Sequence, residues 1–249
     1  MLERNFLVPI IDTDSLTVCK PDGSPFSEEE IKRLTKELNE ISYEHINWDL
    51  EFYIPSVIAV KSKNYILHDP EKKYLKKGLV IKGASLKASN KEIYLKDFIN
   101  SVINLLIQPE YHSSQVVELY EKTAKECLGV TDMTRFAFKK SYTEAVMKGM
   151  GTAELKARLA LKYKQGVQQG DKFRMFYLPN KELCLDENFK GEYCRATLLK
   201  KLYATVKVFS TIIDINLFTN YSLQTNYYPF IGEEKPKRAK KVSKALTAD

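Results

Sequence analysis

Arg4-Asn5-Phe6-Leu7-Val8-Pro9-Ile10-Ile11-Asp12-Thr13-Asp14-Ser15-Leu16-Thr17-Val18-Cys19 is the stretch that decides the fold. It begins with an apolar run, passes through a short acidic segment, and continues with apolar residues that alternate with Thr17 and Cys19. This pattern is typical of two strands joined by a tight turn. The stretch therefore predicts a β-hairpin that carries the carboxylates of Asp12 and Asp14 at its tip.

Two aspartates so close together repel each other unless a cation or a proton neutralises them. Mg²⁺ is a suitable occupant, because it takes one or two carboxylates and fills its other positions with water and substrate phosphates. The alternative is an Asx-type turn in which Asp12 and Asp14 only accept hydrogen bonds from backbone amides. The residues alone leave both interpretations open.

The composition is that of a globular protein with one large or two small domains. The chain has 249 residues, of which 44% are hydrophobic and 29% are charged. Its net charge of +7 and its pI near 9.0 favour a polyanionic partner, although a basic surface can also serve solubility alone. The sequence has no apolar run of about 18 residues and no signal peptide, so we expect a cytoplasmic protein without a membrane partner.

Cysteine and histidine chemistry is not supported by the spacing. Cys19, Cys127, Cys184 and Cys194 form no C-x-x-C pair, and the three histidines are scattered. Reduced, buried thiols are the expectation for such cysteines. The pattern favours neither a zinc site nor a histidine-activated nucleophile.

Beyond the hairpin, the sequence predicts a mixture of strands and helices. Ser27 and Glu30 form a capping box that begins a helix, whose apolar stripe is expected to lie on a sheet. That stripe consists of Ile31, Leu34, Leu38 and Ile41. Extended segments are expected from Trp48 to Val60, at 61–67 and at 134–141. Helices are expected from about Asp97 to a cap at Gly129 and from about Glu192 to Val206.

Asp12-Thr13-Asp14-Ser15, placed between hydrophobic strands, resembles the metal-binding palm hairpin called motif C in family B DNA polymerases. The resemblance implies that Asp14 is a direct metal ligand and Asp12 a secondary one, in a catalytic site that holds two Mg²⁺ ions. Ile10-Ile11 stand where the family usually has Tyr-Gly.

Lys63-Asn64-Tyr65 matches the last three positions of the family's Lys-Lys-x-Tyr strand, with Ser62 in place of the first lysine. The resemblance implies that Lys63 and Tyr65 contact the DNA near the primer end. Asp49-Leu50-Glu51 is similar to an Asp-x-Glu that phage members place close to the metals, so Asp49 and Glu51 are further candidate ligands.

The segment 76–83 is similar to the strand and glycine that close the palm in this family. The later part of the chain is similar in its order of elements to the thumb of these polymerases, which implies a helix at 155–160 and a strand at 172–178. The implied contacts with the DNA backbone are Lys82, Lys139, Lys140, Arg158, Lys162 and Lys172. Basic side chains of this kind neutralise phosphates independently of base sequence.

The expected fold class is therefore α+β: a partial polymerase palm, an antiparallel sheet with a helix, at 1–96, followed by a mainly helical thumb at 97–232. Residues 233–249 form a basic tail that we expect to be disordered, and that serves either solubility or nonspecific contact with DNA.

The family's motif A aspartate, motif B helix, fingers and exonuclease are not found in this sequence, although Met1 stands only a few residues before the hairpin. The resemblance thus implies the C-terminal subunit of a split, phage-like family B DNA polymerase. Its partners would be an N-terminal polypeptide that supplies the missing parts, primer-template DNA and dNTP, in the cytoplasm, or the host cytoplasm if the source is viral. The alternatives are a non-catalytic DNA-binding accessory protein and, below it, a truncation with no role.

Overall fold

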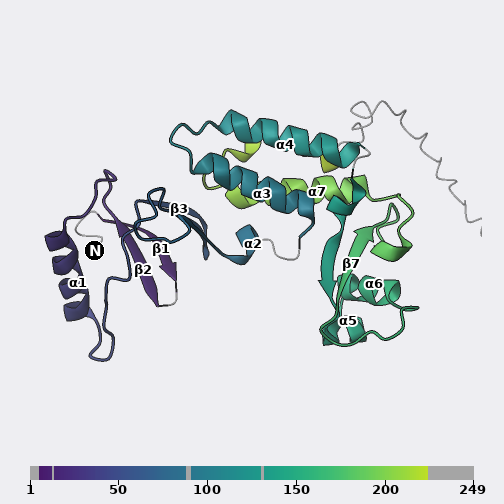
Figure 1. Ribbon diagram of the computed structural model, residues 1–249, viewed down its shortest axis with the longest axis horizontal. Helices are drawn as coiled ribbons and strands as arrows, with labels where there is room; N and C mark the ends of the chain where they lie inside the picture. The colour runs from purple at the N-terminus through teal and green to yellow at the C-terminus, as the bar shows by residue number, and fades with distance from the viewer. Residues whose placement is uncertain (1–5, 13, 88–90, 130–131, 224–249) are drawn as a thin grey trace, which may run out of the picture.

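The computed structural model describes residues 6–12, 14–87, 91–129 and 132–223. The basic tail 233–249, which the sequence predicts to be disordered, lies outside these ranges. The chain runs from two small sheets and a helix at one end, through a layer of long helices, to a third small sheet with two short helices at the other end (Figure 1). All three sheets are antiparallel.

The first sheet is the predicted hairpin of β1 (Leu7–Asp12) and β2 (Ser15–Cys19). Asp12 lies opposite Ser15 in the register, so Asp14 belongs to the turn between the strands. The pairing is irregular between Leu7 and Ile10, where the proline of β1 lacks the N–H that a regular ladder requires. The prediction of a hairpin with two aspartates at its tip is confirmed.

Helix α1 (Glu28–Ile41) begins at the predicted capping box. The Ser27 hydroxyl accepts from the amide of Glu30, and the Glu30 carboxylate accepts from the amide of Ser27 and from Lys20. The prediction that its apolar stripe is covered by a sheet was wrong, because no residue of α1 is buried and Ile41 is 76% exposed. Ile31, Leu34 and Leu38 are half-buried, so the stripe is partly covered and leaves hydrophobic surface in water mainly at Ile41.

The second sheet has the order β3-β4-β5, with β3 (Ser56–Lys61), β4 (Asn64–His68) and β5 (Leu79–Lys82). The expected strand from Trp48 starts only at Ser56. Asn39 of α1 explains the difference, since its side chain donates to the carbonyl of Trp48 and accepts from the Trp48 amide, which holds this segment against the helix end. Asp49 and Glu51 consequently lie in a loop rather than at the start of a strand.

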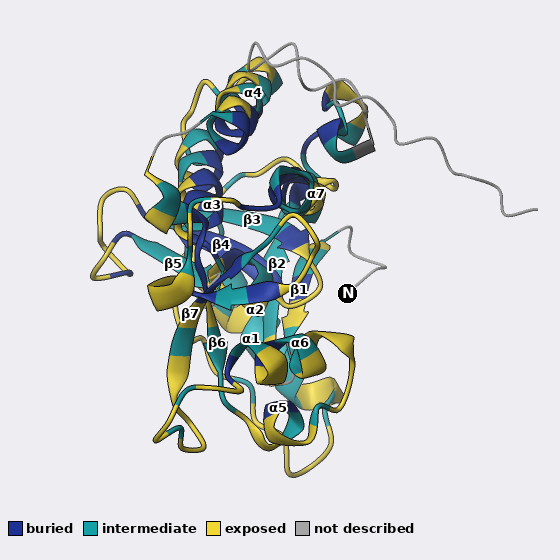
Figure 2. Cartoon of the chain, turned by 90° about the vertical axis from the view of Figure 1, so that its right-hand side faces the viewer, coloured by how far each residue is buried: buried dark blue, intermediate teal, exposed yellow. Residues whose placement is uncertain are grey.

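The main core lies among α2 (Ala84–Lys87), α3 (Ile93–Leu106), α4 (Ser113–Leu128) and α7 (Arg195–Val206), which carry much of the buried surface in Figure 2. Tyr94, Phe98 and Tyr120 are almost completely buried there. The helix expected from about Asp97 begins four residues earlier, because Tyr94 and Leu95 already belong to its buried face. The expected boundary between 96 and 97 thus falls inside α3.

The third sheet has the order β6-β7-β8, with β6 (Phe138–Ser141), β7 (Lys172–Tyr177) and β8 (Leu183–Leu185). Its separate core includes Val146 from α5 (Glu144–Lys148) and Ala157 from α6 (Thr152–Ala160). The described part of the chain after residue 97 is mainly helical, as expected, and it includes this small sheet.

The strand expected over 134–141 is half replaced by a 3-10 turn, η2 (Met133–Phe136), because the side chain of Asp132 accepts from the amide of Thr134 and turns the chain. Four further 3-10 turns follow β8 and α7. They are η3 (Asp186–Asn188), η4 (Lys207–Phe209), η5 (Ile215–Leu217) and η6 (Tyr221–Leu223). Within the described ranges, no helix is both long enough and apolar enough to cross a membrane.

Candidate metal and nucleic-acid site

The tip of the first hairpin presents its two carboxylates at the surface. The Asp12 side chain is 33% exposed, and Asp14 is exposed in the turn. No hydrogen bond or ion pair joins the Asp14 carboxylate to another described residue. Asp14 is therefore presented to solvent on a β-hairpin.

Lys63 connects this tip to the second sheet. It lies in the turn between β3 and β4 with φ of 57°, a left-handed conformation that is uncommon for lysine. Its Nζ is 3.9 Å from Oδ1 of Asp12. Because both side chains are at least partly exposed, this pair is worth little for stability, but it brings the predicted DNA-contacting lysine to the predicted metal ligand.

Tyr65 of β4 lies beneath the same tip. Burial raises the pKa of its phenol, and the negative charges of Asp12, Glu51 and Asp14 raise it further. These three carboxylates are thus near enough to act on one hydroxyl, whereas Asp49 has no such effect. Of the two tentative ligands, Glu51 is the one whose charge acts on Tyr65.

An apolar cluster explains why the hairpin rests on the second sheet. Ile10 of β1 packs with Tyr65 and Leu67 of β4 and with Leu75 of the loop that follows. All four are buried to more than nine-tenths. The acidic tip is therefore held by side chains whose removal from water favours this one arrangement.

The Lys63 turn is fixed from a second side by Asn64 and Gly83, which the sequence did not single out. The Asn64 side chain is buried, donates to the carbonyl of Ser62 and accepts from the amide of Ser85. Gly83 has φ of +98°, and a Cβ there would lie 2.3 Å from Oδ1 of Asn64 and 2.4 Å from the carbonyl of Lys63. Only glycine fits this approach.

The donor set at the tip suits magnesium only in part. Carboxylate oxygens are the ligands that Mg²⁺ prefers, and one or two of them are sufficient when water and substrate supply the rest. Within the described ranges, however, no three histidine, cysteine, aspartate or glutamate side chains come together as a metal-binding group. Asp12 and Asp14 fit a shared site, to which other groups contribute, and do not fit a closed one.

The remaining predicted DNA contacts lie in two places. Lys82 is exposed at the end of β5 and pairs with Tyr65 in the register, so it belongs to the same sheet as Lys63. The others lie on the third sheet and α6, which Figure 1 shows at the far end of the molecule from β1 and β2. They are Lys139, Lys140, Arg158 and Lys172.

Lys140 differs from its neighbours because its ammonium group is 3.1 Å from Glu154 of α6. This pair lowers the pKa of the Glu154 carboxyl. Lys139, Arg158 and Lys172 are exposed, and Lys162, just beyond α6, is exposed as well. Lys140 is therefore paired with Glu154, and the four exposed basic residues are better placed to bind an external phosphate.

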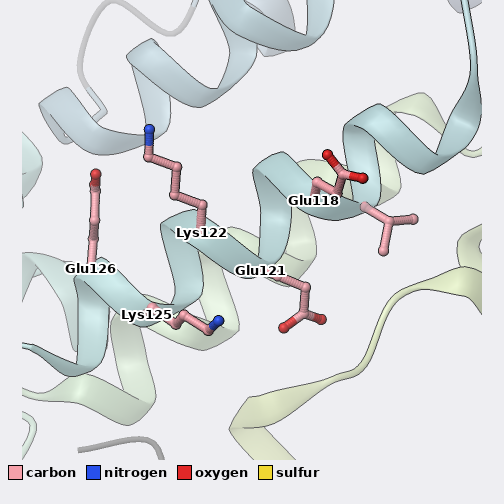
Figure 3. A pocket seen from close by; sticks show the side chains of 6 residues that line it. Glu118, Glu121, Lys122, Lys125 and Glu126 are labelled. Atoms are coloured by element: carbon pink, nitrogen blue, oxygen red, sulfur yellow. The ribbon is translucent and has the colours of Figure 1, made fainter.

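A surface hollow of about 590 Å³ lies elsewhere, on α4. All the residues that line it come from that helix, and Figure 3 shows acidic and basic side chains extending from it in different directions. They are Val117, Glu118, Glu121, Lys122, Lys125 and Glu126. A single helix face with alternating charges converges on no point, so this hollow has none of the features of a reaction site.

Comparison with solved structures identifies a related fold. The family B DNA polymerase from the hyperthermophilic archaeon Pyrobaculum calidifontis matches over 85% of this chain, with a TM-score of 0.58 and 16% sequence identity. The described fold is polymerase-like. The chain corresponds to 28% of that polymerase's length. No protein-family model and no curated protein sequence matches this chain.

Proposed function

We propose that this chain is the C-terminal subunit of a split family B DNA polymerase, which supplies the end of the palm and the thumb. The observation that carries the proposal is an Asp-Thr-Asp-Ser hairpin within a fold that matches a family B DNA polymerase over most of the chain. The likeness in fold does not depend on which residues stand at positions 12 and 14. It therefore supports the role of these aspartates independently of the sequence motif.

In this proposal Asp14 and Asp12 hold divalent metal, and Glu51 is a further candidate ligand. When bound, Mg²⁺ would favour attack by the primer 3′-hydroxyl and neutralise negative charge on the leaving pyrophosphate. The protein's own part is to fix the carboxylates on a rigid hairpin. The Lys63 ammonium group, 3.9 Å from Asp12, offsets part of their mutual repulsion.

DNA is bound in this proposal by two groups of basic residues. Lys63 and Lys82 on the second sheet contact the duplex near the primer end, together with Tyr65. Lys139, Arg158, Lys162 and Lys172, at the other end of the molecule, contact the backbone further along the product. Contacts with phosphate give affinity without base preference, as a replicative enzyme requires.

A separate N-terminal polypeptide completes the site. Two features support this part of the proposal: the metal ligands are too few for a closed site within the described residues, and apolar side chains near the hairpin are exposed. The exposed residues include Leu7, Ile11, Ile41, Tyr43 and Leu50. Such surface favours a stable, largely apolar interface between subunits. The proposed source is a phage, and the proposed location is the host cytoplasm.

The test is primer extension by the complex that co-purifies with the chain from its native source, with its components identified by mass spectrometry. Asp14→Asn is expected to reduce Mg²⁺-dependent extension at least about 100-fold, because losing a carboxylate ligand removes several kcal/mol of charge stabilisation. Asp22→Asn is the matched control, since it makes the same chemical change at an exposed turn where asparagine also accepts from Ser24. Extension near the wild-type rate by the Asp14 variant would contradict the metal role and favour an accessory DNA-binding protein.

A further inference from the structure

The loop 69–78, which connects β4 to β5, concentrates positive charge and is named the lysine loop below. Lys72, Lys73, Lys76 and Lys77 are all exposed in it. Among the described residues, none of these four lysines has a carboxylate within 4.0 Å, unlike Lys140 and Lys201 elsewhere in the chain. Glu71 is the loop's exposed acidic residue. The lysine loop therefore presents a net positive surface that internal pairing does not neutralise.

Asp69 orders this loop from inside. It is fully buried, and its Oδ2 accepts from the amides of Tyr74 and Leu75 at 2.6 and 2.8 Å. Its own amide donates to the carbonyl of Gly78, which closes the loop. Burial opposes ionisation of Asp69, but the backbone hydrogen bonds from Leu75 and Tyr74 outweigh it and hold the pKa below its ordinary value. The carboxylate is thus a fixed centre around which the chain turns.

Two further features make the lysine loop rigid. Gly78 has φ of +68°, and a Cβ there would lie 2.9 Å from the carbonyl oxygen of Asp69. Leu75 is buried in the same apolar cluster as Ile10 of the acidic hairpin. The loop is consequently folded before any ligand arrives, and its lysines lose less conformational entropy on binding than lysines on a flexible segment.

We propose that the lysine loop is a binding site for the phosphate backbone of duplex nucleic acid. Closely spaced lysines around a preformed turn match a row of phosphates, and releasing counterions from the duplex drives such binding. Lysines on α1 and α4 lack this character, because carboxylates such as Glu40 and Glu121 alternate with them. This inference deepens the proposed function, on which it rests for the choice of a duplex as ligand.

The position of the lysine loop gives the proposal a length scale. The loop and the Lys63 turn lie at opposite ends of β4, which runs from Asn64 to His68. Because a strand rises about 3.3 Å per residue, the four residue steps of β4 separate the loop from the Lys63 turn by roughly 13 Å. This distance corresponds to about four base pairs of a duplex at about 3.4 Å per pair. The second sheet would therefore hold two points of one duplex within half a helical turn.

The first experiment measures binding of the full chain to a fluorescent 20-base-pair duplex by anisotropy, in EDTA, between 50 and 200 mM NaCl. Changing the four loop lysines to glutamine is expected to weaken binding at least about tenfold at 50 mM salt. The slope of log K against log salt is expected to fall by about one for each phosphate that the variant no longer neutralises. The control variant makes the same change in charge by replacing four lysines of α1 and α4 with glutamine. They are Lys32, Lys36, Lys122 and Lys125. Equal weakening by both variants would overturn the proposal.

The second experiment compares two variants that each raise the net charge by one. Glu71→Gln leaves the loop's hydrogen bonds intact and is expected to bind the duplex as tightly as wild type, or more tightly. Asp69→Asn is expected to bind at least about threefold more weakly, because a neutral side chain holds the two amides less firmly and the lysines lose their fixed positions. If both variants bind more tightly, charge alone decides and the preformed site is refuted.

Binding in EDTA separates this proposal from the catalytic one. Failure of Asp14→Asn to reduce extension would remove the metal role and leave the lysine loop standing. Failure of the loop variants to weaken binding would remove the loop and leave the metal role standing.

Discussion

Lys201 of α7 is the residue that we expect to hold the third sheet on the helical core. Its ammonium group donates to Glu92, which precedes α3 and is 1% exposed. The same group lies 4.7 Å from the ring centre of Phe138 in β6 and 4.3 Å from that of Tyr177 in β7. The two rings are themselves stacked. Lys201→Met keeps most of the side chain's length and removes only the charge.

The expected loss of stability follows from the burial of the two partners. Removing one member of a fully buried ion pair costs about 3–5 kcal/mol, because the other charge is left without compensation. The Lys201 side chain is 30% exposed, so water reaches the site and about half of that cost is expected. Removing the cation from the faces of the two aromatic rings adds about 0.5–1 kcal/mol. The sum is about 2–3.5 kcal/mol, or a fall in Tm of about 4–14 °C.

Thermal unfolding followed by circular dichroism measures this fall. Lys200→Met is the matched control, since it removes an exposed charge from the neighbouring position of α7 and is expected to change stability by less than about 0.5 kcal/mol. Glu92→Leu combined with Lys201→Met is expected to be more stable than either single variant, because no buried charge then remains unpaired. A single Lys201 variant as stable as wild type, or a double variant no better than the singles, would refute the reasoning.

The remaining predictions concern the core, the acidic tip and the lysine loop. Tyr94→Phe removes a buried hydroxyl that donates to the carbonyl of Leu198, and is expected to cost about 1 kcal/mol in chemical denaturation; an unchanged midpoint would contradict this. Glu51→Gln is expected to slow primer extension by the complex more than Asp49→Asn, and the reverse order would show that the wrong carboxylate faces the metals. Because the folded pKa of Asp69 is lowered, its contribution is complete above the ordinary value of 3.8 and is lost as pH falls through the folded pKa. Amide exchange at Tyr74 should therefore accelerate in that range more than exchange in α3.

Local signals in the sequence were sufficient for several elements. The hairpin of β1 and β2 follows from apolar strands around an acidic turn, and the start of α1 follows from Ser27 and Glu30, three positions apart. The helix expected from about Glu192 to Val206 is likewise present as α7. In each case the residues that determine the element are close neighbours in the chain, so a short stretch of sequence is sufficient to predict it.

Longer-range contacts were not visible in this way. The strand expected from Trp48 failed because Asn39, nine positions earlier, binds its backbone. Glu92 and Lys201 are separated by more than a hundred positions, and nothing near either one marks it as a buried partner. Asp69 stands among exposed lysines, where a carboxylate usually faces solvent. Sequence patterns report the periodicity of an element, but they do not report which distant group will meet it.

The fit between Gly83 and the Lys63 turn has a consequence for mutational libraries. In a library that samples every amino acid at each position, selection for DNA synthesis should recover glycine alone at position 83, while Lys82 beside it tolerates other cationic residues. Substitutions at position 83 would then have the same effect as substitutions in the β3–β4 turn, twenty residues earlier in the chain. A mutational scan read in chain order would wrongly attribute that effect to the end of β5.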